Sequence, residues 1–189
     1  MVRVKICGLT NLADARLASD LGAHALGFIF YPKSPRYLAP EAARDIIAQL
    51  PPLVLAVGVF VNEELATVRE LADQMGLDWL QLHGEEPPDY CQAAYQGRVR
   101  AFLLDTYKSG QKGGTGQIFD WSLAVSAKNW GPVILAGGLN PDNIAAAVQA
   151  VQPPAVDVAS GVEAAPGRKD PDKLRAFFKA LNYDCKENL

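Results

Sequence analysis

The chain has 189 residues, of which 49% are hydrophobic and 21% are charged, and its formal net charge at pH 7 is −3. This composition is typical of a folded globular protein and excludes extensive disorder. The mildly acidic balance and the lack of a Lys/Arg run argue against nucleic acid or an anionic membrane as the main partner. We therefore expect a single domain over residues 1–189 with a sizeable core.

The predicted elements alternate between short apolar runs and helical stretches. In chain order they are strand 2–7, helix 11–21, strand 25–30, helix 40–50, strand 53–61, helix 63–75, strand 79–82, helix 88–95, strand 99–104, helix 121–128, strand 133–136, helix 142–151, strand 155–159 and helix 171–181. Strands that alternate with helices of about ten residues indicate βαβ units and a parallel sheet.

Membrane insertion, secretion and metal binding have no support in the sequence. No apolar stretch approaches the ~20 residues of a membrane-spanning helix. Arg3 and Lys5 place charges where a signal peptide needs apolar residues, so we expect a cytoplasmic protein. The three cysteines, Cys7, Cys91 and Cys185, are too few and too scattered for a disulfide framework or a zinc site.

Two architectures are built from βαβ units, an open doubly wound sheet and a closed TIM (β/α)8 barrel. A dinucleotide-binding open sheet carries G-x-G-x-x-G after its first strand, whereas the first strand here ends in the sequence CGLT. Polar and glycine residues instead follow almost every predicted strand, where a barrel assembles its site from the βα loops. These residues are Cys7, Asn62, His83, Asp105, Gly137, Gly138, Ser160 and Gly161. We therefore predict an α/β fold of the TIM (β/α)8 barrel class.

Two glycine turns follow the last two predicted strands, at Gly137-Gly138 and Ser160-Gly161. Adjacent glycines let the backbone approach a ligand closely, and barrels often bind a phosphate at the loops after their last two strands. The alternative is that the first turn is only structural, with Asn140 capping the helix that follows. The presence of both turns in the last two units favours a phosphate site.

Cys7 and Asp105 are the candidate proton-transfer groups, because each ends an apolar strand at the mouth of the predicted barrel. A thiol there can act as a base or nucleophile where a positive neighbour lowers its pKa; otherwise it is a small apolar residue that closes the strand. A carboxyl group at a partly dry site suits a proton donor; otherwise loop N–H groups satisfy it.

Three further polar residues each have two interpretations. Arg36, on a loop with two prolines, can bind a carboxylate through its guanidinium, or it is a solvated loop residue. His83 lacks a second ligand at metal-binding spacing, so a site-lining or packing role is favoured over metal binding. Asp157, inside an apolar strand, needs a partner, and we interpret it as structural.

Nine sequence motifs, taken together and in order, resemble the phosphoribosylanthranilate isomerase family of tryptophan biosynthesis. The resemblance runs from residue 4 to about residue 181. The motifs are KICGLT (5–10), YPKSPR (31–36), VGVFVN (57–62), QLHGEE (81–86), LLDT (103–106), GGTG with FDW (113–121), LAGGLNPDN (135–143), VDVASGVE (156–163) and PGRKD (166–170).

The resemblance implies an Amadori rearrangement of a phosphoribosyl aldose into a 1-amino-1-deoxy ketose, without cofactor or metal. By the match, Cys7 is the general base and Asp105 the general acid. Arg36 holds the anthranilate carboxylate, and the turns at Gly137-Gly138 and Ser160-Gly161 hold the 5′-phosphate, with His83 as a further substrate-binding residue. The implied partner is a small phosphorylated substrate, and the implied assembly is a monomer or homodimer.

The chain departs from the family pattern in one place, around residues 96–102. The family has a further strand and helix between the QLHGEE helix and LLDT, whereas here one βα interval separates these motifs. We predict seven strands and a barrel short of one βα unit, in keeping with a length just below the roughly 200 residues of a small complete barrel. Two alternatives therefore stay open: a catalytically impaired barrel that binds a phosphoribosyl ligand, and another phosphosugar barrel enzyme.

Overall fold

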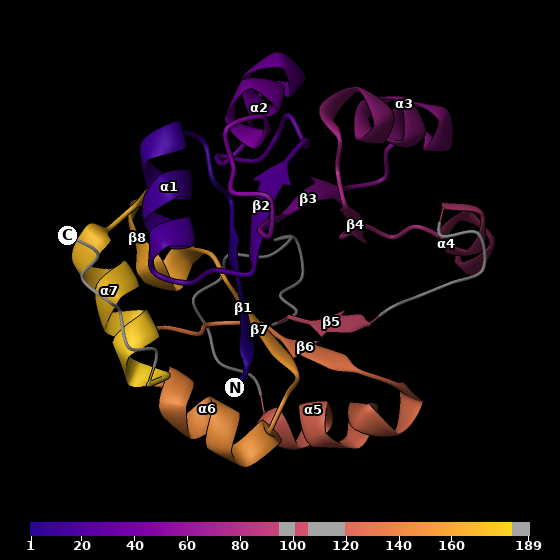
Figure 1. Ribbon diagram of the computed structural model, residues 1–189. Helices are drawn as coiled ribbons and strands as arrows, with labels where there is room; N and C mark the ends of the chain where they lie inside the picture. Colours follow the sequence, from indigo (N-terminus) through magenta and orange to yellow (C-terminus); the bar gives the residue numbers. More distant parts are fainter. Residues whose placement is uncertain (95–100, 106–119, 183–189) are drawn as a thin grey trace.

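The computed structural model of the chain describes residues 1–94, 101–105 and 120–182. Seven strands form one parallel sheet in the order β4-β3-β2-β1-β7-β6-β5 (Figure 1). The first strand lies between the second and the seventh, which is the order of a barrel. The strands are β1 (Arg3–Cys7), β2 (Ala25–Ile29), β3 (Leu55–Phe60), β4 (Trp79–Leu82), β5 (Phe102–Leu104), β6 (Val133–Leu135) and β7 (Ala155–Val158).

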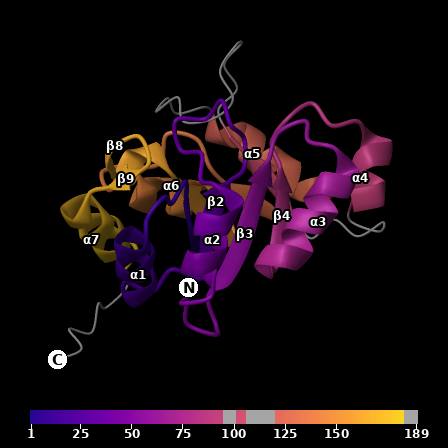
Figure 2. The same cartoon turned by 90° about the horizontal axis from the view of Figure 1, so that it is seen from above.

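The helices surround this sheet, as Figures 1 and 2 show from two directions. One helix follows each strand up to β6, and the last helix follows a short hairpin after β7. The helices are α1 (Leu12–Asp20), α2 (Pro40–Ile47), α3 (Leu65–Met75), α4 (Pro88–Ala94), α5 (Trp121–Ala127), α6 (Ile144–Val151) and α7 (Pro171–Ala180). The predicted barrel class is confirmed, with each of these elements within a few residues of its expected bounds.

The sheet pairing stops at one place, between β4 and β5. Within the described residues, β4 pairs with β3 and β5 pairs with β6, and no pairing joins β4 to β5. This break lies where the sequence predicts that one βα unit is missing. The strand predicted at 99–104 begins at Phe102, and residues 95–100 lie outside the described part of the chain.

The core lies between the sheet and the surrounding helices. Because successive side chains of a strand point to opposite faces, Val4 and Ile6 pack toward the helices while Lys5 and Cys7 point to the other face. In β2, Leu26 and Phe28 are fully buried in the same core, so the residue between them, Gly27, faces the inside of the sheet. The alternation therefore places Lys5, Cys7 and Gly27 together inside the barrel.

A small hairpin after β7 is a part of the fold that the sequence did not predict. A 3₁₀ turn at Ser160–Val162 leads into β8 (Glu163–Ala165), which pairs antiparallel with β9 (Arg168–Lys169). Strands of two and three residues are too short to show an alternating pattern, which explains why they escape prediction. This hairpin carries two of the buried charges of the molecule.

Candidate active site

The strand ends of β5, β6 and β7 enclose a small cavity of about 40 Å³ at the carboxyl end of the sheet. Five of the eight residues predicted for the site line it together, and Asp157 lines it as well. These five are Asp105, Gly137, Gly138, Ser160 and Gly161. The candidate acid and the two candidate phosphate-binding turns therefore lie at one place.

The backbone at the two turns requires glycine. Gly137 and Gly138 have φ angles of 85° and 64°, in the left-handed region that other residues rarely adopt. At Gly161 an added Cβ would lie 1.8 Å from the carbonyl oxygen of Leu139, so only a residue without a side chain fits. Asn143 donates from Nδ2 to the Gly138 carbonyl over 2.9 Å, which fixes the first turn.

Cys7 ends β1 with its side chain buried beside β2. Its register partner is Gly27, where an added Cβ would lie 2.8 Å from the Cys7 Sγ. Burial raises the pKa of the Cys7 thiol, and the Lys5 ammonium opposes that rise. The thiol is thus placed at the mouth, as predicted, in surroundings that favour its neutral form at rest.

Asp157, a buried carboxylate inside a strand, is paired with Lys5. Lys5 donates from Nζ to its Oδ1 over 2.9 Å, and the two residues are register partners on the neighbouring strands β1 and β7. Burial alone would lower the pKa of Lys5, but the Asp157 carboxylate and the Cys7 thiol outweigh it and raise that pKa. Lys5 is therefore a buried ammonium ion.

Arg36 already binds a carboxylate within the chain. Its Nε lies 2.9 Å from Oε1 of Glu163 and its Nη2 lies 2.8 Å from Oε2, a bidentate pair that fixes the guanidinium plane. Its stem crosses Gly8, where an added Cβ would lie 2.6 Å from the Arg36 Cδ. The interpretation of Arg36 as a freely solvated loop residue is therefore wrong.

The buried ammonium of Lys169 joins β1, the residue after β7 and β8. Its Nζ donates to the Cys7 carbonyl over 2.7 Å, to the Ala159 carbonyl over 3.1 Å and to Glu163 Oε1 over 2.9 Å. Burial lowers the pKa of Lys169. Burial alone would raise the pKa of Glu163, but Arg36 and Lys169 outweigh it and hold the pKa of that carboxyl below its usual value.

Glu163 and Lys169 were missed by the sequence analysis. All four buried charged residues in the described part of the chain belong to two ion pairs, Lys5–Asp157 and Glu163–Lys169. The only signal for the second pair was the presence of charges in the SGVE and PGRKD motifs, which surface residues would show equally. Their burial depends on the hairpin, which the sequence did not predict.

His83 and Asp105 face each other across the break in the sheet. His83 follows β4, Asp105 follows β5, and the His83 Nε2 lies 3.7 Å from the Asp105 Oδ2. Both side chains are about one-fifth exposed. The structure thus places the candidate acid next to the predicted site-lining histidine.

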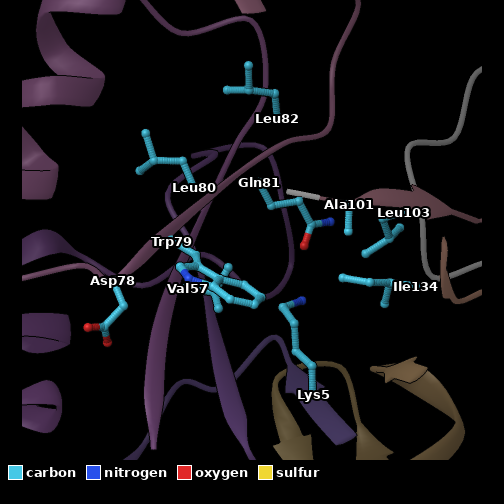
Figure 3. A pocket seen from close by; sticks show the side chains of 10 residues that line it. All are labelled: Lys5, Val57, Asp78, Trp79, Leu80, Gln81, Leu82, Ala101, Leu103 and Ile134. Carbon is cyan, nitrogen blue, oxygen red and sulfur yellow. The ribbon is translucent and has the colours of Figure 1, made fainter. Parts of the chain in front are cut away.

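A larger cavity of about 360 Å³ opens below this pair, between β4 and β5. Trp79 and Gln81 line it from one side and Leu103 and Ile134 from the other, and the Lys5 side chain points into it from β1 (Figure 3). The cavity occupies the part of the barrel interior where one βα unit is predicted to be missing.

No helix among the described residues is long and apolar enough to cross a membrane. Within the same ranges, no three His, Cys, Asp or Glu side chains gather closely enough to hold a metal ion.

The comparisons with known proteins agree with one another. A family model described as N-(5'phosphoribosyl)anthranilate (PRA) isomerase matches residues 4–101 and 91–180. The chain is 53% identical to the N-(5'-phosphoribosyl)anthranilate isomerase of Citrifermentans bemidjiense over 197 residues, which covers 94% of this chain and 96% of that relative. Because 94% of 189 residues is about 178, about 19 of the 197 aligned positions have no residue in this chain. The two family-model segments overlap at residues 91–101, beside the break in the sheet.

Two solved structures superpose on most of the chain. The phosphoribosyl anthranilate isomerase of Thermotoga maritima superposes with a TM-score of 0.88 and 43% identity, over 96% of this chain and 99% of that one. A phosphoribosyl anthranilate isomerase in complex with reduced 1-(o-carboxyphenylamino)-1-deoxyribulose 5-phosphate superposes with a TM-score of 0.85, also at 43% identity and the same coverage.

Proposed function

This chain belongs to the N-(5'-phosphoribosyl)anthranilate isomerase family of tryptophan biosynthesis, and from this premise we propose that Cys7 and Asp105 perform the proton transfers of the family's reaction. The reaction is an aldose–ketose isomerisation, the Amadori rearrangement of N-(5'-phosphoribosyl)anthranilate to 1-(2-carboxyphenylamino)-1-deoxyribulose 5-phosphate. It moves protons within one molecule and consumes no oxidant or reductant.

Asp105 acts first, as the general acid. Its protonated carboxyl group gives a proton to the ring oxygen of the ribose while the bond from that oxygen to C1′ breaks, which leaves a protonated Schiff base. His83, 3.7 Å from the Asp105 carboxylate, restricts where that group points. A positioned acid of this kind contributes about 10²–10⁴-fold to the rate.

Cys7 acts second, as the general base. Its thiolate takes the proton from C2′ of the Schiff base and the electron pair moves toward the iminium nitrogen. The resulting enol becomes the ketose when C1′ gains a proton and the C2′ hydroxyl loses one. Because the iminium carries a positive charge beside C2′, this proton is far more acidic than in the closed sugar. The Lys169 contact to the Cys7 carbonyl holds the end of β1 in place for this step.

The two anionic groups of the substrate bind at two separate places in the mouth. The 5′-phosphate lies at Gly137-Gly138 and Ser160-Gly161, where the absence of side chains lets the backbone come close. The carboxylate of the anthranilate lies at Arg36, whose plane Glu163 fixes. The observation that carries this proposal is the cavity that joins Asp105 to both glycine turns.

The second candidate function is a barrel that binds the phosphoribosyl ligand without converting it. It is favoured by the break in the sheet, because the candidate acid ends a three-residue strand beside that break. The glycine turns and Arg36 belong to strands on the continuous side, so ligand binding survives even if the acid is misplaced. The third candidate, another phosphosugar barrel enzyme, has no observation in its favour.

A fluorescence assay separates isomerase from binder. Anthranilate adducts emit, so loss of the substrate signal follows turnover in the wild type, Cys7→Ser and Asp105→Asn. We expect each variant to fall by about 10²–10⁴-fold while still binding reduced 1-(o-carboxyphenylamino)-1-deoxyribulose 5-phosphate in calorimetry. Wild-type turnover no faster than that of Asp105→Asn, with binding retained in both, would identify the binder instead.

The remaining proposals concern the whole protein. We infer one domain that acts in the cytoplasm, on a small phosphorylated substrate, without nucleic acid, membrane, metal or cofactor. A monomer or a homodimer stays a prediction, and sedimentation of the purified chain decides it.

A further inference from the structure

Lys5 is a buried cation that the proposed reaction does not yet use. It lies two residues before Cys7 on β1, so both side chains point into the barrel from the same face of the strand. The Lys5 side chain is only 7% exposed, and within the described residues its one ion-pair partner is Asp157. A buried ammonium beside a candidate thiol base has consequences for that thiol.

The space that brings the two groups together is made by Gly27. An added Cβ there would lie 2.8 Å from the Cys7 Sγ and 3.1 Å from the Lys5 Nζ. Both atoms therefore lie close to the same point, and they are at most about 6 Å apart. At this distance an opposite charge favours the ionised form of a group. No side chain of β2 separates them at this place, because the residue is glycine.

Three charged groups act on the thiol from the elements packed around it. Lys5 comes from β1 itself, Asp157 from β7 and Lys169 from β9, while β2 presents only Gly27. Burial raises the pKa of Cys7, the two ammonium groups lower it, and the Asp157 carboxylate raises it. Asp157 thus has two opposed effects, since it also holds the ammonium in place.

We propose that Lys5 is a positioning residue for Cys7: held by Asp157, its ammonium is the counter-charge that stabilises the thiolate form of the base. This inference rests on the proposed function for the meaning of the thiolate, but the charge coupling itself does not depend on turnover. When the thiol loses its proton, Lys5 lies between two anions, on Asp157 and on Cys7. Asp157 therefore moderates the same charge that it positions.

The coupling predicts that two variants shift the titration of Cys7 in opposite directions. Replacing the ammonium by the apolar side chain of Lys5→Met removes the charge that most lowers the pKa of the thiol, so Cys7 titrates at higher pH. Replacing the carboxylate in Asp157→Asn removes the competing anion while keeping the side-chain shape, so Cys7 titrates at lower pH. A pair that only supported the fold would destabilise the protein in both variants without moving the thiol in opposite directions.

The test is a titration of Cys7 followed by the ultraviolet absorbance of its thiolate. The Cys7→Ser protein serves as the blank, which removes the signals of Cys91, Cys185 and the tyrosines. We expect the midpoint to rise by about 1 pH unit or more in Lys5→Met, to fall in Asp157→Asn and to stay near the wild type in Lys5→Arg, which keeps the charge. Circular dichroism checks that each variant is folded over the pH range.

A Lys5→Met midpoint equal to or below the wild type, or a shift of the same sign in both variants, overturns the proposal. If Lys5→Met does not fold, Asp157→Asn decides alone. A Cys7 titration midpoint in Asp157→Asn that does not fall below the wild-type value then overturns the proposal. The turnover assay with Cys7→Ser is separate: full activity there defeats the general-base role of Cys7 while the titration still measures the coupling.

Discussion

The two candidate proton-transfer groups lie in opposite kinds of surroundings. Cys7 ends a five-residue strand that pairs with β2 on one side and with β7 on the other. Asp105 follows a three-residue strand whose recorded pairing, within the described residues, is with β6. The candidate base therefore belongs to the continuous part of the barrel, and the candidate acid belongs to the edge of its break.

The side chains around the two groups differ in the same way. Leu9 and Ile6, next to Cys7, are fully buried, whereas Phe102 at the start of β5 is 41% exposed and Trp79 on β4 is 36% exposed. Few buried contacts and an exposed edge are the features of a segment that opens at low free-energy cost. The break in the sheet therefore weakens the surroundings of the candidate acid, while the candidate base keeps its support.

The largest expected effect is on the free energy of unfolding, and it concerns the continuous part of the barrel around Cys7. Lys169→Met removes the ammonium that the Cys7, Ala159 and Glu163 oxygens share, and within the described residues it leaves the buried Glu163 carboxylate with Arg36 as its one ion-pair partner. Breaking a buried ion pair from one side costs about 3–5 kcal/mol of the free energy of unfolding. Urea denaturation measures it, with the exposed Lys179→Met as a control that changes stability by less than about 0.5 kcal/mol. Equal urea denaturation midpoints for the two variants would show that Lys169 does not stabilise the region around Cys7.

The next prediction compares the same truncation on both sides of the molecule. Leu26→Ala, on β2, removes a fully buried side chain and should cost about 2–5 kcal/mol. Leu103→Ala, on β5, removes a half-buried side chain beside the 360 Å³ cavity, so it should cost about 1 kcal/mol. Denaturant midpoints compare the two. A larger loss for Leu103→Ala would show that the edge contributes more than its burial indicates.

A smaller effect follows from the Glu163 carboxylate. Its pKa is held below the usual 4.5 by Arg36 and Lys169 against the opposing effect of burial. A lowered pKa adds stability that is fully present above the unfolded value and is lost as the pH falls through the folded value. The wild type should therefore lose stability below about pH 4.5 more steeply than Glu163→Gln, which cannot titrate there. Thermal unfolding at several pH values measures both slopes, and parallel slopes would contradict the role of this carboxylate.

The smallest expected difference is dynamic. The amides of Leu103 and Leu104 on β5 should exchange with solvent faster than those of Ile6 and Cys7 on β1, because an edge segment opens more readily than a strand paired on both sides. Hydrogen exchange followed by NMR measures the rates at pH 7. Equal protection of the two strands would indicate that β5 opens only with the whole molecule.

The sequence predicted what depends on local pattern. Apolar runs such as VIL at 133–135 identify buried strands, and polar or glycine residues directly after them identify the mouth of the barrel. The grouping of Asp105 with both glycine turns followed from the parallel topology alone, since all strand ends of such a sheet meet at one edge.

What the sequence did not reveal depends on contacts between distant segments. Asp157 was known to need a partner, but Lys5 lies 152 residues away and is identified only by the register of β1 with β7. Arg36 and Glu163 are 127 residues apart, and their pairing follows from the unpredicted hairpin. A charge in the sequence therefore gives no sign of whether it is buried or which charge it meets.

The contact between the Lys169 ammonium and the Cys7 carbonyl joins residues 162 positions apart. Synthesis proceeds from the N-terminus, so Cys7 leaves the ribosome 162 residues before Lys169 does, and this support arrives late. Strand β7, the second neighbour of β1, also comes late. Any nascent or truncated chain that ends between β7 and Lys169 therefore lacks the ammonium contact to the candidate base, although both neighbouring strands of β1 are already present.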